Sequence, residues 1–249
     1  MKRVLVFVYG VVCYAVFFAT FLYAFGFIGN LFVAKSIDSG AQGPLREALL
    51  INAALLGLFA IQHSVMARQS FKRQLTKIIP AAAERSTYVL LSSLCLILLF
   101  AQWRPMGGVI WDVQDATGRA LLFGLYGFGW LLVLATTFLI NHFDLFGLRQ
   151  VWLYLRGQEY KKLEFVTPGP YKHIRHPLYL GWLFAFWATP TMTAAHLVFA
   201  LATTAYILIA IRLEERDLVD LHGEAYKNYR EEVPMLLPVG RKKATLQEA

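Results

Sequence analysis

The sequence predicts an all-α integral membrane protein, because its apolar residues form long blocks and its basic residues gather in alternate connecting segments. Hydrophobic residues make up 57% of the 249 residues and charged residues only 16%, proportions that differ from those of soluble domains. The apolar blocks are about 20 residues long, which is the length at which a helix crosses the hydrocarbon core of a bilayer. We therefore expect a bundle of membrane-spanning helices.

Five apolar segments predict these helices, at residues 4–28, 46–66, 86–103, 118–140 and 178–211. The last segment is too long for one crossing and is interrupted by TPTMT at residues 189–193. Pro190 disfavours a helix interior at the interruption, whereas Pro177 suits the first position of a helix. We expect a helical hairpin, with a short first arm at residues 178–189 that stops before the far surface and a return arm at residues 194–212.

The basic residues predict the orientation of the chain. Most Lys and Arg residues lie at the N-terminus, in the loops at residues 67–85 and 141–177, or in the C-terminal tail; the exceptions are Lys35, Arg46, Arg104 and Arg119. Because basic loops are retained in the cytoplasm, we expect both termini to be cytoplasmic. The net charge of +8 is then explained by topology and by anionic lipid head groups, and no nucleic-acid partner is expected.

The chain predicts a single membrane domain over residues 1–249. Residues 1–140 would supply four transmembrane helices, and residues 141–249 a loop, the hairpin and a C-terminal segment. The loop at residues 141–177 and the tail should form a cytosolic cap. The GLYGFG motif at residues 124–129 lies inside an apolar segment, where small residues favour close helix packing over phosphate binding.

The segment GPYKHIRHPLYLGW, at residues 169–182, places ionisable groups at the entrance of the hairpin. A hairpin returns its second arm beside its first, so Glu214 and Glu215 at the exit should lie near Arg175 and His176. Carboxylates in the last turn of a helix are unfavourable against its dipole, which favours a function for these glutamates. The alternative is a solvated acidic pair that neighbouring arginines balance.

Two histidines near predicted helix ends are candidates for proton transfer. His63 lies towards the end of the second apolar segment, and His142 follows the fourth, with Asp144 beside it. Ionisable groups at membrane depth are functional candidates, although a hydrogen bond to a neighbouring helix would explain either histidine equally well. His196 is expected to be structural. The sequence contains no H-E-x-x-H, C-x-x-C, G-x-S-x-G or P-loop motif, so metal binding, dithiol redox chemistry and serine hydrolysis have no support.

The motifs R-H-P-x-Y-x-G, E-E and Y-x-x-Y-x-x-x-V-P follow one another within about the last 80 residues. In this order they resemble the isoprenylcysteine carboxyl methyltransferase-like superfamily, whose members are membrane enzymes that use S-adenosylmethionine. The resemblance implies a cofactor pocket formed by the hairpin and the C-terminal segment instead of a nucleotide-binding sheet. The cofactor-binding residues that it implies are Tyr171, Arg175, His176, Tyr179, Glu214, Glu215, Tyr226 and Tyr229.

Three further stretches, IQHSVMAR, NHFDLFGLRQVW and FWATPTMT, resemble the bacterial methanethiol S-methyltransferases within that superfamily, which are close to NnrU-type proteins. This closer resemblance implies methylation of a small thiol, methanethiol, to dimethyl sulfide in the bacterial inner membrane, and leaves the oligomeric state open. Because the thiolate is the nucleophile, the site must lower the thiol pKa or accept its proton; the catalytic candidates are Arg175, His63, and His142 with Asp144.

Other functions remain as alternatives at this stage. A different methyl acceptor, such as a prenylcysteine carboxylate or a phospholipid, would suit the same cofactor pocket. A membrane reductase with a nicotinamide cofactor would share the helical architecture. A non-enzymatic, NnrU-like membrane protein would need no convergence of Arg175 and His176 with Glu214 and Glu215.

Overall fold

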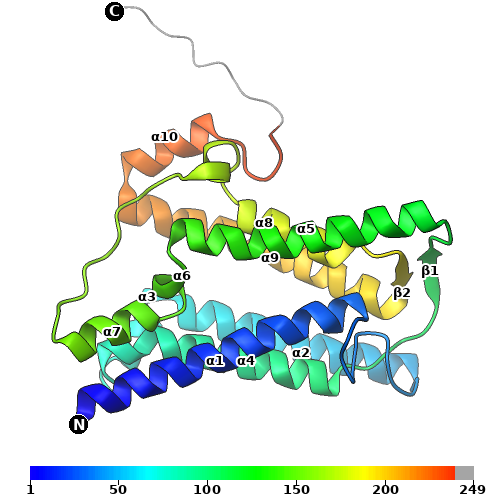
Figure 1. Cartoon of the computed structure of the whole chain (residues 1–249), viewed down its shortest axis with the longest axis horizontal. Coiled ribbons are helices and arrows are strands. Elements are labelled where there is room, and N and C mark those ends of the chain that lie inside the picture. The colour runs from blue at the N-terminus through cyan, green and yellow to red at the C-terminus, as the bar shows by residue number, and fades with distance from the viewer. Residues whose placement is uncertain (239–249) are drawn as a thin grey trace, which may run out of the picture.

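The computed structural model describes residues 1–238 and is 72% helical. Its apolar helices form two layers (Figure 1). One layer contains α1 (Lys2–Gly29), α2 (Leu45–Ala67) and α4 (Glu84–Gln102); the other contains α5 (Ala116–Ile140), α8 (Pro177–Trp187) and α9 (Ala194–His222). Within the described residues, five helical segments are long and apolar enough to cross a membrane, and α8 is a shorter apolar helix. The predicted all-α integral membrane fold is confirmed.

The final apolar segment forms the predicted hairpin. Helix α8 has 11 residues and spans only about 16 Å at 1.5 Å per residue, so it cannot cross the bilayer. Pro177 is its first residue, where the missing N–H costs no hydrogen bond. Helix α9 begins after Thr193, whose hydroxyl accepts a hydrogen bond from the His196 N–H at 3.1 Å. The His196 ring bonds the Phe186 carbonyl at 2.9 Å and so joins the two arms of the hairpin, as expected of a structural histidine.

A small sheet at the turn of the hairpin was not expected from the sequence. Strand β1 (Val109–Asp112) pairs antiparallel with β2 (Thr191–Thr193). The Thr191 hydroxyl donates to Asp112 at 2.8 Å, and Thr193 bonds Asp38 of the loop that follows α1. The sheet therefore fixes the far end of the short arm to the connections between the other helices.

The packing predicted for the GLYGFG motif is confirmed at one of its three glycines. A Cβ atom on Gly129 would lie 2.7 Å from the carbonyl oxygen of Gly181, so α5 and α8 approach each other closely at this pair. Gly124 and Gly127 have open space where a Cβ would be, and close packing was the wrong explanation for them. At 100° per residue, Gly129 lies on a different face of the helix from both.

Short elements cover one end of the bundle, the end at which the N-terminus lies (Figure 1). They are α3 (Gln69–Leu75), η1 (Ala81–Ala83), α6 (His142–Leu145), α7 (Leu148–Arg156), η2 (Gly169–Lys172) and α10 (Glu224–Glu232). The cap expected from the loop at residues 141–177 and the tail is present, with α10 as the described part of the tail, and α3 and η1 from the loop at residues 67–85 add to it unexpectedly. The remaining part of the predicted tail, which includes Arg241, Lys242 and Lys243, lies outside the described residues.

The close approach of α5 and α8 predicts different effects of the same substitution at two glycines. Gly129→Ala should lower the free energy of unfolding by about 1–3 kcal/mol, because its methyl group would overpack the contact with Gly181. Gly124→Ala, in the same helix but with open space, should leave stability unchanged or raise it by up to about 1 kcal/mol. Thermal unfolding of purified protein in detergent measures both changes. Equal effects of the two substitutions would contradict the packing described.

Candidate functional site

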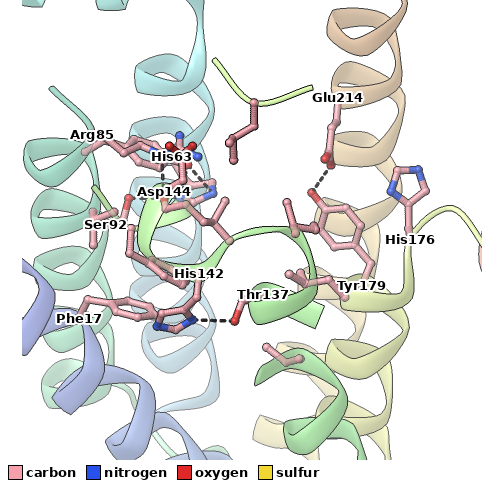
Figure 2. A pocket seen from close by; sticks show the side chains of 18 of the residues that line it. Phe17, His63, Arg85, Ser92, Thr137, His142, Asp144, His176, Tyr179 and Glu214 are labelled. Carbon is pink, nitrogen blue, oxygen red and sulfur yellow. Dashed lines mark hydrogen bonds between the residues drawn. The ribbon is translucent and has the colours of Figure 1, made fainter. Parts of the chain in front are cut away.

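A cavity of about 1270 Å³ lies between the two helix layers. Its deep part is apolar and is lined by Phe21, Leu99, Phe100, Phe186 and Phe199 from the long helices. Its other end reaches the cap, where polar side chains replace the aromatic ones. Figure 2 shows His63, Arg85 and Ser92 on one side of this space and His176, Tyr179 and Glu214 on the other. The cavity therefore connects the apolar interior of the bundle with a charged opening.

The entrance and exit of the hairpin meet at a buried charged contact. Arg175 Nε donates to Glu215 Oε1 at 2.7 Å, and His176 Nε2 lies 3.0 Å from the same oxygen. The three side chains are between 5% and 13% exposed. The proximity of Arg175 and His176 to the end of the return arm, expected from the hairpin alone, is thus confirmed.

The same arginine holds the C-terminal segment against the hairpin. Its Nη1 donates to the carbonyl oxygens of Arg230, at 2.7 Å, and Val233, at 2.5 Å. The backbone N–H groups of Arg175 and His176 donate to the carbonyls of Pro234 and Met235. Nε and Nη1 of Arg175 both donate to acceptors within the protein. Arg175 is therefore better placed to support the site than to bind a ligand carboxylate through these two nitrogens.

The two glutamates of α9 have different surroundings. Glu214 lines the cavity and accepts a hydrogen bond from the Tyr179 hydroxyl at 2.8 Å. Glu215 is engaged with Arg175 and His176 and is not part of the cavity wall. Consecutive helical residues differ by about 100° in direction. Glu214 therefore faces the cavity, while Glu215 faces Arg175 and His176.

Tyrosines form the wall where the hairpin meets the C-terminal segment. The Tyr229 hydroxyl donates to the Tyr171 carbonyl at 2.6 Å, and Phe165 packs edge-on against the rings of Tyr226 and Tyr229. Tyr226 is 1% exposed, and its hydroxyl has no hydrogen-bond partner among the described residues. Burial raises the pKa of Tyr229 to about 12 and that of Tyr226 above its ordinary value. Both hydroxyls are therefore neutral, and that of Tyr226 is available to a ligand.

His63 belongs to a polar cluster on the opposite wall. Its Nε2 lies 2.7 Å from the Tyr88 hydroxyl and its Nδ1 lies 3.2 Å from the Ser92 hydroxyl. The ring stacks on Phe59, with 5.1 Å between centroids. His63, Tyr88 and Ser92 all line the cavity. The sequence indicates the histidine as a candidate but not its partners, which lie one helical turn apart on α4.

His142 is held in one tautomer by its neighbours. The Thr137 hydroxyl donates to the Leu134 carbonyl at 2.7 Å, so it must accept the hydrogen bond of 2.8 Å from His142 Nδ1. The other ring nitrogen, Nε2, then accepts from the Tyr14 hydroxyl at 2.8 Å. Burial lowers the pKa of His142, which favours this neutral form, and both ring nitrogens already have partners.

Asp144 does not contact His142, although the two were considered together as one proton-accepting pair. Its carboxylate pairs with Arg149 at 2.8 Å and accepts from the Tyr160 hydroxyl at 3.2 Å. His142 and Asp144 both belong to the one-turn helix α6, which the Asn141 side chain caps by accepting a hydrogen bond from the Asp144 N–H. Residues two apart on a helix point in nearly opposite directions, so His142 and Asp144 have different partners although both line the cavity.

The charged contact at the base of the hairpin predicts a large coupling in stability. Arg175→Met and Glu215→Gln should each lower the free energy of unfolding by about 3–5 kcal/mol, because each leaves a buried polar partner uncompensated. The double variant should cost less than the sum of the two. Thermal unfolding in detergent measures the cycle. The exposed pair Lys227–Glu224 is the control, since Lys227→Met should change stability little; additive effects at Arg175 and Glu215 would contradict the contact.

Comparison with known proteins places the chain in a family. The NnrU protein family matches residues 50–235. The chain is 57% identical to a methanethiol S-methyltransferase of Crocosphaera subtropica, over 97% of this chain and 95% of the relative, and 52% identical to one of Mycobacterium tuberculosis, over 96% and 98%. It is 30% identical to nurim of Xenopus laevis, over 72% and 65%. No solved structure matches it significantly. The chain belongs to the NnrU family, together with the methanethiol S-methyltransferases that it resembles over nearly its whole length.

Proposed function

We propose that the protein is a membrane methyltransferase that moves a methyl group from S-adenosylmethionine to methanethiol and releases dimethyl sulfide and S-adenosylhomocysteine. The observation that carries the proposal is that one cavity combines a charged opening with an apolar interior. A charged, water-soluble donor and a small apolar acceptor need these two environments within reach of each other. The names of the most similar relatives support the same reaction.

The residues at the opening fit such a donor. The hydroxyl of Tyr226 is buried without a hydrogen-bond partner among residues 1–238, which is expected of a group that bonds a ligand. Glu214 supplies a carboxylate on the cavity wall beside Tyr179, and aromatic faces attract a cationic sulfonium group. We assign donor binding to Glu214, Tyr179, Tyr171, Tyr226 and Tyr229. Arg175, His176 and Glu215 position this wall through their mutual contact.

Proton removal from the thiol is assigned to His63. When bound, the donor supplies a methyl group on a positively charged sulfur; the thiolate forms the new carbon–sulfur bond as the old one breaks. The thiol proton has to leave first, because the thiol itself is a poor nucleophile. His63 and Tyr88 both line the cavity in hydrogen-bond contact, so His63 accepts the proton with Tyr88 beside it. Both ring nitrogens of each histidine have partners, but both partners of His63 line the cavity, whereas Tyr14, which bonds His142 Nε2, does not.

The membrane location suits the acceptor. The deep, aromatic part of the cavity lies among the membrane-spanning helices, and an apolar thiol partitions readily into a bilayer. We assign the capped end to the cytoplasm and the protein to the bacterial inner membrane, because the N-terminus, the loops and the C-terminal segment at this end together carry most of the basic residues. The donor then approaches from the cytoplasm and the thiol from the bilayer.

The reaction is tested with purified protein, S-adenosylmethionine and a panel of acceptors. We expect dimethyl sulfide from methanethiol, measured by gas chromatography, and much less product from a prenylcysteine or from phospholipid vesicles. Absence of dimethyl sulfide, or equal methylation of the lipid acceptors, would reject methanethiol as the substrate.

Tyr226→Phe should weaken S-adenosylhomocysteine binding by about 5–10-fold, because one hydrogen bond is lost.

The assignment of the base predicts different effects at two histidines. His63→Gln should lower kcat by about 100-fold or more at neutral pH, while S-adenosylhomocysteine still binds. Activity of this variant should rise steeply with pH, since a thiol with a pKa near that of cysteine, about 8.5, then ionises unaided. His142→Gln should retain most of its kcat. A larger loss of kcat at His142 than at His63 would show that the assignment is wrong.

A further inference from the structure

The wall opposite the hairpin carries two partly buried cations, Lys72 and Arg85, that have no carboxylate partner among residues 1–238. Lys72 of α3 is half-buried, lines the cavity, and has no carboxylate within 4.0 Å among residues 1–238. Burial and the neighbouring Arg85 lower the pKa of Lys72. A half-buried ammonium group beside a second cation is unfavourable unless an anion joins it.

Arg85 also faces the cavity without a carboxylate partner in residues 1–238. Its Nε donates to the Leu145 carbonyl at 2.8 Å, and its guanidinium lies 5.4 Å from the centre of the Tyr88 ring. These two contacts fix the direction of the side chain and leave its terminal nitrogens for other bonds. In Figure 2, Arg85 lies beside His63 and across the cavity from Glu214.

A carboxylate with an unused oxygen lies next to these cations. Glu84 lines the cavity, and its Oε1 is buried without a hydrogen-bond partner in the described chain. Its charge acts on the pKa of Lys72 in the direction opposite to Arg85. The wall therefore offers two cationic side chains and one carboxylate. These charges complement a ligand that carries both a carboxylate and an ammonium group.

We propose that Lys72, Glu84 and Arg85 bind the α-amino-acid end of the methyl donor, with the two cations on its carboxylate and Glu84 on its ammonium group. This inference rests on the proposed function. It makes the donor span the cavity, with its nucleoside end at the tyrosine wall and its amino-acid end at the α3–α4 wall. Tyr88 lies under Arg85 and bonds His63, so this arrangement keeps the donor sulfur close to the proposed base.

Two ligands separate this site from the rest of the pocket. S-adenosylhomocysteine carries the amino-acid end, whereas 5′-methylthioadenosine has the same nucleoside and a thioether sulfur but lacks that end. Calorimetry on the purified full chain should show that Lys72→Met weakens S-adenosylhomocysteine binding by about 10-fold or more, as expected for a lost charged hydrogen bond. Binding of 5′-methylthioadenosine should be unchanged, which also shows that the variant is folded.

Three further variants complete the test. Glu84→Gln should weaken S-adenosylhomocysteine selectively, and Lys72→Arg, which keeps the charge, should restore most of the affinity. Lys77→Met removes a charge from an exposed residue near the same helix that does not line the cavity, and it should bind both ligands as the unaltered protein does.

The outcomes distinguish this inference from the proposed function. Unchanged S-adenosylhomocysteine affinity in Lys72→Met would overturn the assignment and leave the proposed function standing. Equal weakening of both ligands in Lys72→Met and Lys72→Arg would also overturn it, because the residue would then act on the fold. If the unaltered protein bound neither ligand, the proposed function and this inference would fall together.

Discussion

The contact of Arg175 and His176 with Glu215 is the constraint on which the site depends. Helix α8 is too short to cross a bilayer, so its position has to be set at its ends. The β1–β2 sheet fixes the far end, and the charged contact fixes the near end to α9 and to the C-terminal segment. With both ends fixed, Tyr179 and Glu214 face the cavity together. The ion pair thus supports the binding wall and does not itself need to touch a ligand.

The two walls of the cavity differ in charge, and this difference explains how one pocket could bind an amphoteric donor. The hairpin presents Glu214 and neutral tyrosines beside Arg175, whose charge Glu215 neutralises, and the α3–α4 side presents Lys72 and Arg85 with Glu84. Between them the cavity continues into an aromatic interior that excludes water and suits an apolar acceptor. A soluble nucleotide-binding sheet is unnecessary, because side chains from two helix layers supply the complementary charges.

Much of this arrangement follows from the sequence, because a bilayer imposes length and charge rules on a chain. Apolar blocks and two prolines predicted the helices and the hairpin, and the hairpin brought Arg175 near Glu215. Finer features depended on side-chain direction, which spacing alone does not give. Spacing did not show that Glu214 and Glu215 face different surroundings, or that His142 and Asp144 have separate partners. Lys72 and Arg85 contributed only to the topology prediction, since a basic loop looks the same whether or not it faces a cavity.

The central claim is that the space between the two helix layers holds the donor and the acceptor together. A cryo-electron microscopy structure of the protein with S-adenosylhomocysteine bound tests it most directly. The account predicts adenosine against the tyrosines of the hairpin side, the amino-acid group against α3 and the start of α4, and the sulfur between Glu214 and His63. Density for the ligand outside this space, or a sulfur shielded from the apolar part of the cavity, would contradict the account.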